Sequence, residues 1–568
     1  MNRFLLGCLA AWLIPTSLAL AQPAPTADGA TTAPLAPPPG EIPWVTNLDD
    51  PPIGSLEAIK GGTFNTFMYD YPLTFRLMGP NSNDAFAAWN RAYTMSFTLL
   101  QRHPVTDNYI PWMASHWAVM PDNRTVYYKL RPEARWTDGE PVTADDYVFA
   151  WEMMGSEAIV DPFYNEYVAT YFESVEALDD LTLKVVGKQP SWRPLDDYAL
   201  FPMPRHAIDL GPDWVQRANN TFQVAAGPYR VTEAITGKHV VFDKVPGWWG
   251  ADLDYFRGLY NVDRIVVHVI PDGRELDYFK QQQIDMTLVA SARIWAEETD
   301  FPAIQNGWAH KKRVFVDTPQ GIYGLHMNLQ FPLFANKDFR KAMQYLFDFD
   351  TLNKNLMYDA YFRIASAFEG TPYANPELKP YPFDPRKARE HLVKAGFTQR
   401  GPDGILVDDQ GRRASFTVIF GGETIERHLT VLREIYKRAG VEMNLQLMDG
   451  ATAFNRGLER KYEMTLTGRT AGFYPEPKQY FHSTFVESTN NNNIWGFGSP
   501  ETDQLIETYM FDMDLQHRLD AMHRLDAIVH DEAFYIPFWT APYLRLLYWD
   551  YVVWPEFILP KRTESSTD

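Results

Sequence analysis

The stretch ASHWAVMPDNRTVYYKLRPEARWTDGEPVTADDYVFAWE occupies residues 114–152 and predicts strand, turn and helix in succession. Side chains over 126–131 alternate in the period of two that is typical of a half-buried strand. The strand is expected to stop at Pro132. Asp138-Gly139 then predicts a turn, because this pair tolerates a positive φ.

The helix of this stretch has both a start signal and a stop signal. Thr143, with Asp146 three residues later, resembles a capping box, in which each residue satisfies a backbone N–H of the other. The helix is predicted over 145–154, and Gly155 is expected to end it.

The second half of the chain predicts a parallel βαβ unit. A strand over 416–420 and a Gly421-Gly422 turn precede a helix over 425–439, whose apolar residues recur every three or four positions. A second strand follows over 441–447, and 451–466 repeats the step. Parallel strands need such a crossover, so the chain is predicted to be an α/β protein with a mostly parallel sheet in this part.

Composition limits the class of partner and the compartment. The chain has 568 residues, of which 45% are hydrophobic, so it can bury several cores. Its net charge of -20 argues against nucleic acid and against anionic lipid as partners. Residues 1–21 have the pattern of a cleaved secretory signal, which predicts a periplasmic protein. Residues 22–43 are rich in Pro, Ala and Thr and predict an extended arm.

Several motifs carry a family resemblance through their order and spacing. They include Trp136 with DGEP at 138–141 and ADD at 144–146, AGPYR at 226–230, FRKA at 339–342, the predicted helix and its flanks over 381–397, and VHDEAFYIPFW at 529–539. Together they resemble the family 5 extracellular solute-binding proteins that serve ABC importers, whose members include oligopeptide-binding proteins. The run NNNIWGF at 491–497, followed by PETD at 500–503, is most similar to the branch that binds peptides and peptide-nucleotide antibiotics.

The resemblance implies a periplasmic-binding-protein type II fold. Two large lobes with mixed, mostly parallel sheets are joined by a hinge, and a small inserted lobe lies beside the first. The expected division is lobe I over 44–85, 195–290 and 530–568, inserted lobe II over 86–194, and lobe III over 291–529. The ligand would be enclosed where the large lobes meet, and an ABC permease in the inner membrane would recognise the closed protein, which is expected to be a monomer.

The resemblance and the spacing also single out candidate ligand contacts. Tyr69-Asp70-Tyr71 follows the first strand of the mature domain, where family members lay a ligand backbone beside the chain. The tyrosines could stack on the ligand and Asp70 could accept an amine. The alternative for this segment is a turn with exposed tyrosines.

The run 468–477 aligns with a family segment whose first Asp clamps the α-amino group of the ligand. This chain has Phe473 at that position, followed by Tyr474. A charged amine without a carboxylate in a closed cleft would be costly, so either another acid such as Asp70 replaces it or the N-terminus is not recognised. Arg469 could hold a carboxylate or phosphate with two hydrogen bonds, although a surface arginine is the more common outcome.

The asparagine-rich segment supplies the remaining candidates. Asn491 and Asn492 lie in a polar loop, and their amides could bond a peptide backbone. Trp495 could stack on a sugar or ligand ring, or lie in the core. The Trp248-Trp249 pair is expected to be core.

Catalytic motifs are missing from the sequence. It has no His-Glu-x-x-His, no Gly-x-Ser-x-Gly, no Walker A loop and no paired Cys motif, since Cys8 is the single cysteine. We therefore expect a binding protein without cofactor or metal that captures an oligopeptide or peptide-like ligand, for instance a cell-wall peptide fragment, for an ABC permease. Two alternatives stay open: the same fold with a nickel chelate, haem, glutathione or an oligosaccharide as ligand, and a secreted hydrolase, because 72 acidic residues make paired carboxylates inevitable.

Overall fold

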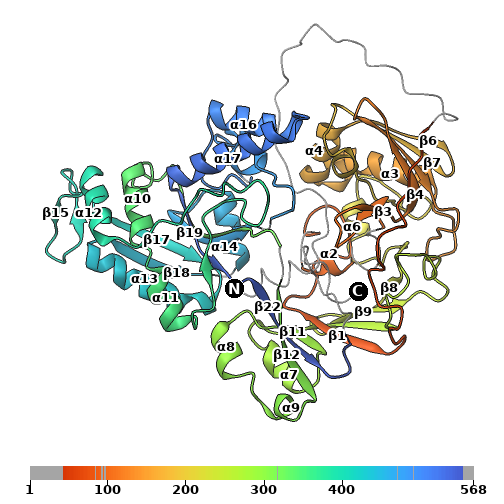
Figure 1. Cartoon of the computed structure of the whole chain (residues 1–568), viewed down its shortest axis with the longest axis horizontal. Coiled ribbons are helices and arrows are strands. Elements are labelled where there is room, and N and C mark those ends of the chain that lie inside the picture. Colours follow the sequence, from red (N-terminus) through yellow and green to blue (C-terminus); the bar gives the residue numbers. More distant parts are fainter. Residues whose placement is uncertain are drawn as a thin grey trace, which may run out of the picture.

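The computed structural model describes residues 42–82, 85–90, 94, 97–315, 318–448, 450–469, 471–489 and 491–553. The predicted signal over 1–21 and all but the last two residues of the predicted arm lie outside this part of the chain. Within the described ranges, no helix combines the length and the apolar composition needed to span a membrane. Four sheets of three or more strands organise the described chain (Figure 1).

The first sheet is antiparallel and lies in the orange part of Figure 1, with strand order β4–β5–β7–β6. Helices α3 and α4 pack beside β6. The bounds are β4 (Ala114–Val119), β5 (Thr125–Leu130), α3 (Ala144–Gly155), α4 (Pro162–Tyr171), β6 (Phe172–Asp179) and β7 (Thr182–Gly187).

The strand and the turn predicted from residues 114–152 are confirmed, with one difference. Strand β5 is buried on both faces rather than one. Its second face is covered because Tyr127 packs with Ile42, Ala118 and Met120, so the segment that begins the described chain closes over the sheet. Gly139 adopts a φ of 98°, as the predicted turn requires.

The predicted capping box is also confirmed. The Asp146 carboxylate accepts from the Thr143 backbone N–H at 2.9 Å and from the Trp136 indole N–H at 3.2 Å. The helix runs from Ala144 to Gly155, one residue longer at each end than predicted, and Ser156 caps it in place of Gly155. The Trp136 contact gives a physical reason for the spacing of the motif, because the same carboxylate caps the helix and fixes the turn before it.

A second sheet, with strand order β1–β10–β9–β8, shares one hydrophobic core with the first. Strands β1 and β10 pair in parallel, and the other two pairs are antiparallel. The Trp248 and Trp249 indoles both donate to the Ala226 carbonyl, which confirms them as structural. The bounds are β1 (Thr63–Met68), β8 (Tyr229–Ile235), β9 (His239–Lys244) and β10 (Arg264–Val269).

The third sheet has five strands in the order β18–β17–β19–β13–β20. Strand β17 pairs in parallel with β18 and with β19. Helix α13 connects β17 to β18 and α14 connects β18 to β19, so the predicted βαβ unit and its repeat are confirmed. The other pairs of this sheet are antiparallel. The sheets are thus mixed, and parallel pairing dominates only around β17.

The five-stranded sheet and the helices of this part are green to blue in Figure 1. They are β13 (Ile322–Met327), α10 (Lys337–Tyr345), α11 (Phe349–Leu356), α12 (Pro385–Lys394), β17 (Ser415–Phe420), α13 (Glu426–Ala439), β18 (Glu442–Leu447), α14 (Gly450–Leu458), β19 (Met464–Arg469), α15 (Lys478–Phe481), α16 (Pro500–Phe511), α17 (Leu515–Glu532) and β20 (Tyr535–Pro537).

The fourth sheet is antiparallel, with β22 between β11 and β12. The chain leaves it for the five-stranded sheet between β12 and β13, and returns after β21. The strand pairing therefore places both crossings later than the predicted boundaries at 290/291 and 529/530. The bounds are α7 (Glu275–Lys280), β11 (Met286–Leu288), α8 (Ala292–Glu297), α9 (Pro302–Gln305), β12 (Ala309–Phe315), β21 (Trp539–Thr540) and β22 (Tyr543–Trp549).

Short elements complete the described chain. They are α2 (Ala85–Asn90), β2 (Leu100–Arg102), β3 (Tyr109–Pro111), the 3-10 helix Glu157–Ile159, α5 (Pro194–Asp197), α6 (Trp214–Arg217), β14 (Phe362–Arg363), β15 (Gln399–Arg400), β16 (Leu406–Val407), and the 3-10 helices Glu423–Ile425 and Ser483–Phe485.

Candidate functional site

The loop after β19 contacts the part of the chain that contains the first sheet. Tyr474, one of the predicted ligand contacts, lies edge-on to Trp192, with 5.2 Å between ring centroids. The guanidinium groups of Arg102 and Arg193 lie over the Tyr474 ring at 5.0 and 5.4 Å. Phe473 packs edge-on against Tyr474 at 5.0 Å. The run that the sequence singled out thus meets β2 and the segment after β7 through one aromatic ring and two cations.

Ion pairs surround this contact. Arg193 Nη2 lies 2.7 Å from Glu476 Oε1, and Arg193 Nε lies 2.9 Å from Asp197 Oδ1. A second guanidinium, that of Arg102, lies 2.6 Å from Asp196 Oδ2. These ion pairs bring three carboxylates and two guanidinium groups together around the contact.

Burial controls the electrostatics of the cluster. It raises the pKa of Glu476 and of Asp197, and the Arg193 charge opposes both rises. Burial lowers the pKa of Arg193, but the two carboxylates outweigh it and hold this pKa well above its ordinary value. The guanidinium therefore stays charged.

Arg469 ends β19, directly before the same loop. Its guanidinium lies over the Phe454 ring at 4.9 Å, and its Nη1 donates to Gly468 O at 2.9 Å and Thr467 Oγ1 at 3.2 Å. Arg469 Nε is buried and has no hydrogen-bond partner within the described ranges. Burial lowers the pKa of Arg469, against the influence of Tyr480. Arg469 is thus a desolvated cation beside this loop, and its Nε donor is unsatisfied among the residues that the structure describes.

The Tyr69-Asp70-Tyr71 segment lies at the end of β1. The Tyr69 hydroxyl donates to Glu275 Oε1, and the Tyr71 ring lies edge-on to Phe75 at 6.4 Å. Asp70 is exposed. The two tyrosines are therefore half-buried and held by their own part of the chain, unlike the turn with exposed tyrosines that the sequence left as the alternative.

The asparagine-rich segment is held by its own hydrogen bonds. Asn491 Nδ2 donates to Ser488 O at 2.8 Å, and Asn492 Nδ2 donates to Gln479 Oε1 at 2.6 Å. Trp495 is fully buried and donates from its indole N–H to His326 Nδ1 at 3.1 Å. Trp495 packs as a core residue in this structure, which matches the second of its two predicted roles.

Five residues opposite the loop could not be predicted from the sequence: Arg102, Trp192, Arg193, Asp196 and Asp197. Each is ordinary in its local context, and only the approach of residues far apart in the chain reveals it. The Arg193–Glu476 bond joins residues 283 positions apart. The one available signal was the Pro-Glu-Pro run that contains Glu476 and directly follows Phe473-Tyr474.

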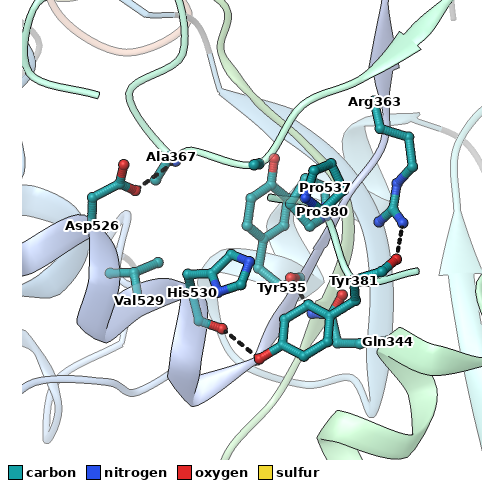
Figure 2. A pocket seen from close by; sticks show the side chains of 11 residues that line it. Gln344, Arg363, Ala367, Pro380, Tyr381, Asp526, Val529, His530, Tyr535 and Pro537 are labelled. Carbon is teal, nitrogen blue, oxygen red and sulfur yellow. Dashed lines mark hydrogen bonds between the residues drawn. The ribbon is translucent and has the colours of Figure 1, made fainter. Parts of the chain in front are cut away.

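A separate pocket lies between α10, β14, α17 and β20, within the part that contains the five-stranded sheet (Figure 2). Arg363 Nη1 donates to Tyr381 O at 2.5 Å, whereas Arg363 Nη2 and Gln344 Oε1 have no partner among the described residues. A free donor and a free acceptor suit one small polar molecule such as water. No group of three or more His, Cys, Asp or Glu within the described chain could hold a metal ion.

Comparisons with known proteins give the family and the fold. The family whose model matches residues 108–493 is described as "Bacterial extracellular solute-binding proteins, family 5 Middle". YejA of Agrobacterium fabrum, named a probable peptide-binding protein, is 24% identical over 477 residues, which cover 76% of each chain.

Two solved structures have the same fold. The oligopeptide-binding protein AppA of Bacillus subtilis, in complex with a nonapeptide, superposes with a TM-score of 0.73 at 17% identity and covers 90% of this chain and 98% of its own. NikZ of Campylobacter jejuni, in complex with Ni(L-His), gives a TM-score of 0.72 at 19% identity and covers 86% and 94%. The type II periplasmic-binding-protein fold is confirmed, and the chain belongs to family 5 of the bacterial extracellular solute-binding proteins, the substrate-binding proteins of ABC transporters.

Proposed function

We propose that this protein captures an oligopeptide or peptide-like ligand between its lobes and delivers it to an ABC permease without altering it. The observation that carries the proposal is Arg469, which ends β19 directly before the loop that contacts Trp192: burial desolvates its guanidinium, and its Nε has no hydrogen-bond partner among the described residues. A carboxylate is the natural partner of such a group, because the charge-assisted bond offsets the cost of burial. Every peptide with a free C-terminus carries one.

The position of Phe473 favours recognition of the carboxylate over recognition of the amine. Where many peptide-binding relatives have an acid, this chain offers an aromatic ring that packs on Tyr474. The ring can contact the apolar parts of a peptide-like ligand but cannot neutralise an ammonium group. YejA of Agrobacterium fabrum supports a peptide through its name, and AppA supports it through its bound nonapeptide.

Location and lobe organisation complete the proposal. We place the mature protein in the periplasm, with cleavage near Gln22. We also propose the three lobes predicted above, with the boundaries of lobe III moved to hinge segments where the chain changes sheets, after β12 and after β21. The ligand contacts that we propose are Arg469, Phe473 and Tyr474, with Tyr69 to Tyr71 on the opposite wall. Mass spectrometry of the protein secreted by its native host tests the cleavage site: a first residue far from 22 contradicts it.

The identity of the ligand is tested with protein to which no ligand has been added. Native mass spectrometry of protein purified without added ligand should reveal a bound species with the mass of a peptide or a cell-wall peptide fragment. A bound metal chelate or sugar would instead favour the alternative ligands of the same fold. Prolonged incubation should return the ligand unchanged, and a cleaved ligand would indicate a hydrolase.

The carboxylate contact is tested by calorimetry with matched peptides. We expect amidation of the C-terminus to weaken binding, and Arg469→Ala to weaken a peptide acid by at least about 1.5 kcal/mol because a charged hydrogen bond is lost. Arg456→Ala, an exposed residue on α14, is the matched control and should bind as the wild type does. Equal affinity for acid and amide, or an unchanged dissociation constant for Arg469→Ala, would remove Arg469 from the site.

A further inference from the structure

Trp192 enters a hydrophobic cluster that otherwise belongs to another part of the chain. Every other member of that cluster lies between residues 322 and 535. The Trp192 indole N–H donates to Tyr509 O at 3.1 Å, and the Arg518 guanidinium lies over the indole at 4.1 Å. Separation of the two parts would break these contacts and expose the ring, so the contact favours the closed arrangement.

The segment that carries Trp192 is fixed to the first sheet. The backbone N–H of Ser191 donates to Asn123 O at 2.9 Å, and the Ser191 hydroxyl donates to Asp197 Oδ2 at 2.6 Å. The Tyr198 hydroxyl donates to Gln189 O. Because both ends of the segment are anchored, the indole is already oriented and loses little conformational freedom when the contact forms.

Arg193 keeps an anionic partner whether or not the two parts touch. Asp197 lies in the same segment, four residues later, and Glu476 comes from the loop after β19. Of these two carboxylates, opening would remove only Glu476. The guanidinium is therefore never left buried without a carboxylate, which is the state that makes a broken buried ion pair expensive. Such an arrangement suits a contact that forms and breaks repeatedly.

We propose that Trp192 and Arg193 form a closure latch, which sets how often the protein is closed before any ligand arrives. The latch acts on the equilibrium between open and closed states and need not touch the ligand. This inference rests on capture between lobes, but not on the ligand being a peptide. A latch that raises the closed population also raises the apparent affinity for whatever binds the closed state.

The test measures a distance in the absence of ligand. The single cysteine of the chain, Cys8, lies in the predicted signal, so Glu173→Cys in β6 and Gln504→Cys in α16 provide two unique sites for spin labels on exposed residues. Pulsed electron spin resonance on the mature protein should show a short distance for the closed state. Trp192→Ala should lower the ratio of short to long distances by about tenfold, and Trp192→Phe by less, because one ring is kept.

Two further variants make the outcome decisive. Glu476→Gln keeps the Arg193–Asp197 pair and should shift the distribution less than Trp192→Ala. Trp308→Ala removes an indole that is 62% exposed and should leave the distribution unchanged. An unchanged distribution in Trp192→Ala overturns the latch, and a lowered unfolding temperature without a change in distance would instead identify a permanent contact. No ligand is added, so this result is independent of the peptide proposal.

Discussion

Lowering the pH from about 7.5 to about 5 should destabilise the part of the protein that contains the five-stranded sheet, because His326 is buried there in its neutral form. His326 Nδ1 accepts from the Trp495 indole N–H at 3.1 Å, so Nε2 carries the proton and donates to Thr467 O at 3.1 Å. The ring also stacks on Tyr535 at 4.8 Å. A second proton on Nδ1 would face the Trp495 N–H and has no acceptor there.

The size and sign of the effect follow from the pKa. Burial, together with the Arg469 charge, lowers the pKa of His326 from 6.5 to about 3, although the bond to Thr467 opposes this. Between these two values the unfolded chain binds a proton that the folded protein excludes. The stabilisation is therefore fully present above the unfolded pKa and is lost as the pH falls towards the folded one. At about pH 5 the loss amounts to about 2 kcal/mol.

The assay compares the pH dependence of two proteins, because other histidines also titrate. Urea unfolding followed by tryptophan fluorescence gives the free energy of unfolding of the wild type and of His326→Gln at both pH values. The variant should lack about 2 kcal/mol of the pH-dependent difference. His523→Gln, at the surface of α17, is the control and should behave as the wild type does. If His326→Gln retains the whole pH dependence, the buried neutral imidazole is not its source.

Three substitutions test the packing of the fold. Asp146→Ala should lower the free energy of unfolding by about 3 kcal/mol, because the α3 cap and the Trp136 indole lose their acceptor; a loss under about 1 kcal/mol in chemical unfolding would contradict this role. Gly324→Ala should displace β20, because a Cβ there would lie 2.0 Å from Ile536 O, and unaltered amide exchange over β20 would refute it. Arg460→Met should raise amide exchange over 485–493, since the Arg460 guanidinium donates to carbonyl groups of that loop; unchanged exchange would mean that other contacts hold the loop.

Local signals predicted the local structure well. The capping box of α3 and the turn at Gly139 depend on neighbours within a few residues, and both are present. The βαβ unit was readable because its helix and strands have different periods. Burial of both faces of β5 was not readable, because Tyr127 is covered by Ile42, which lies far away in the sequence. The positions at which the chain passes from one sheet to another were not readable either, because they depend on strand pairing and no change in composition marks them.

Only one of the two segments that meet at the candidate site could be predicted from the sequence. The sequence singled out the loop of Phe473 and Tyr474 through its family alignment, and the structure places that loop at the contact between two parts of the chain. The residues opposite, Trp192 and Arg193, have no local pattern that separates them from any other tryptophan or arginine. Their role arises from a distance of 2.7 Å between atoms that the sequence separates by 283 positions.

The two connections between the three-stranded and five-stranded sheets are tied to each other. The Thr540 hydroxyl donates to Gln320 Oε1 at 2.6 Å, which joins the outgoing and the returning chain just before they change sheets. Two linked connections should resist twisting about each other, so we expect the proposed lobe closure to be a bending about a single axis. Substitutions at 320 and 540 should then have non-additive effects on that motion, since either one alone frees the same degree of freedom.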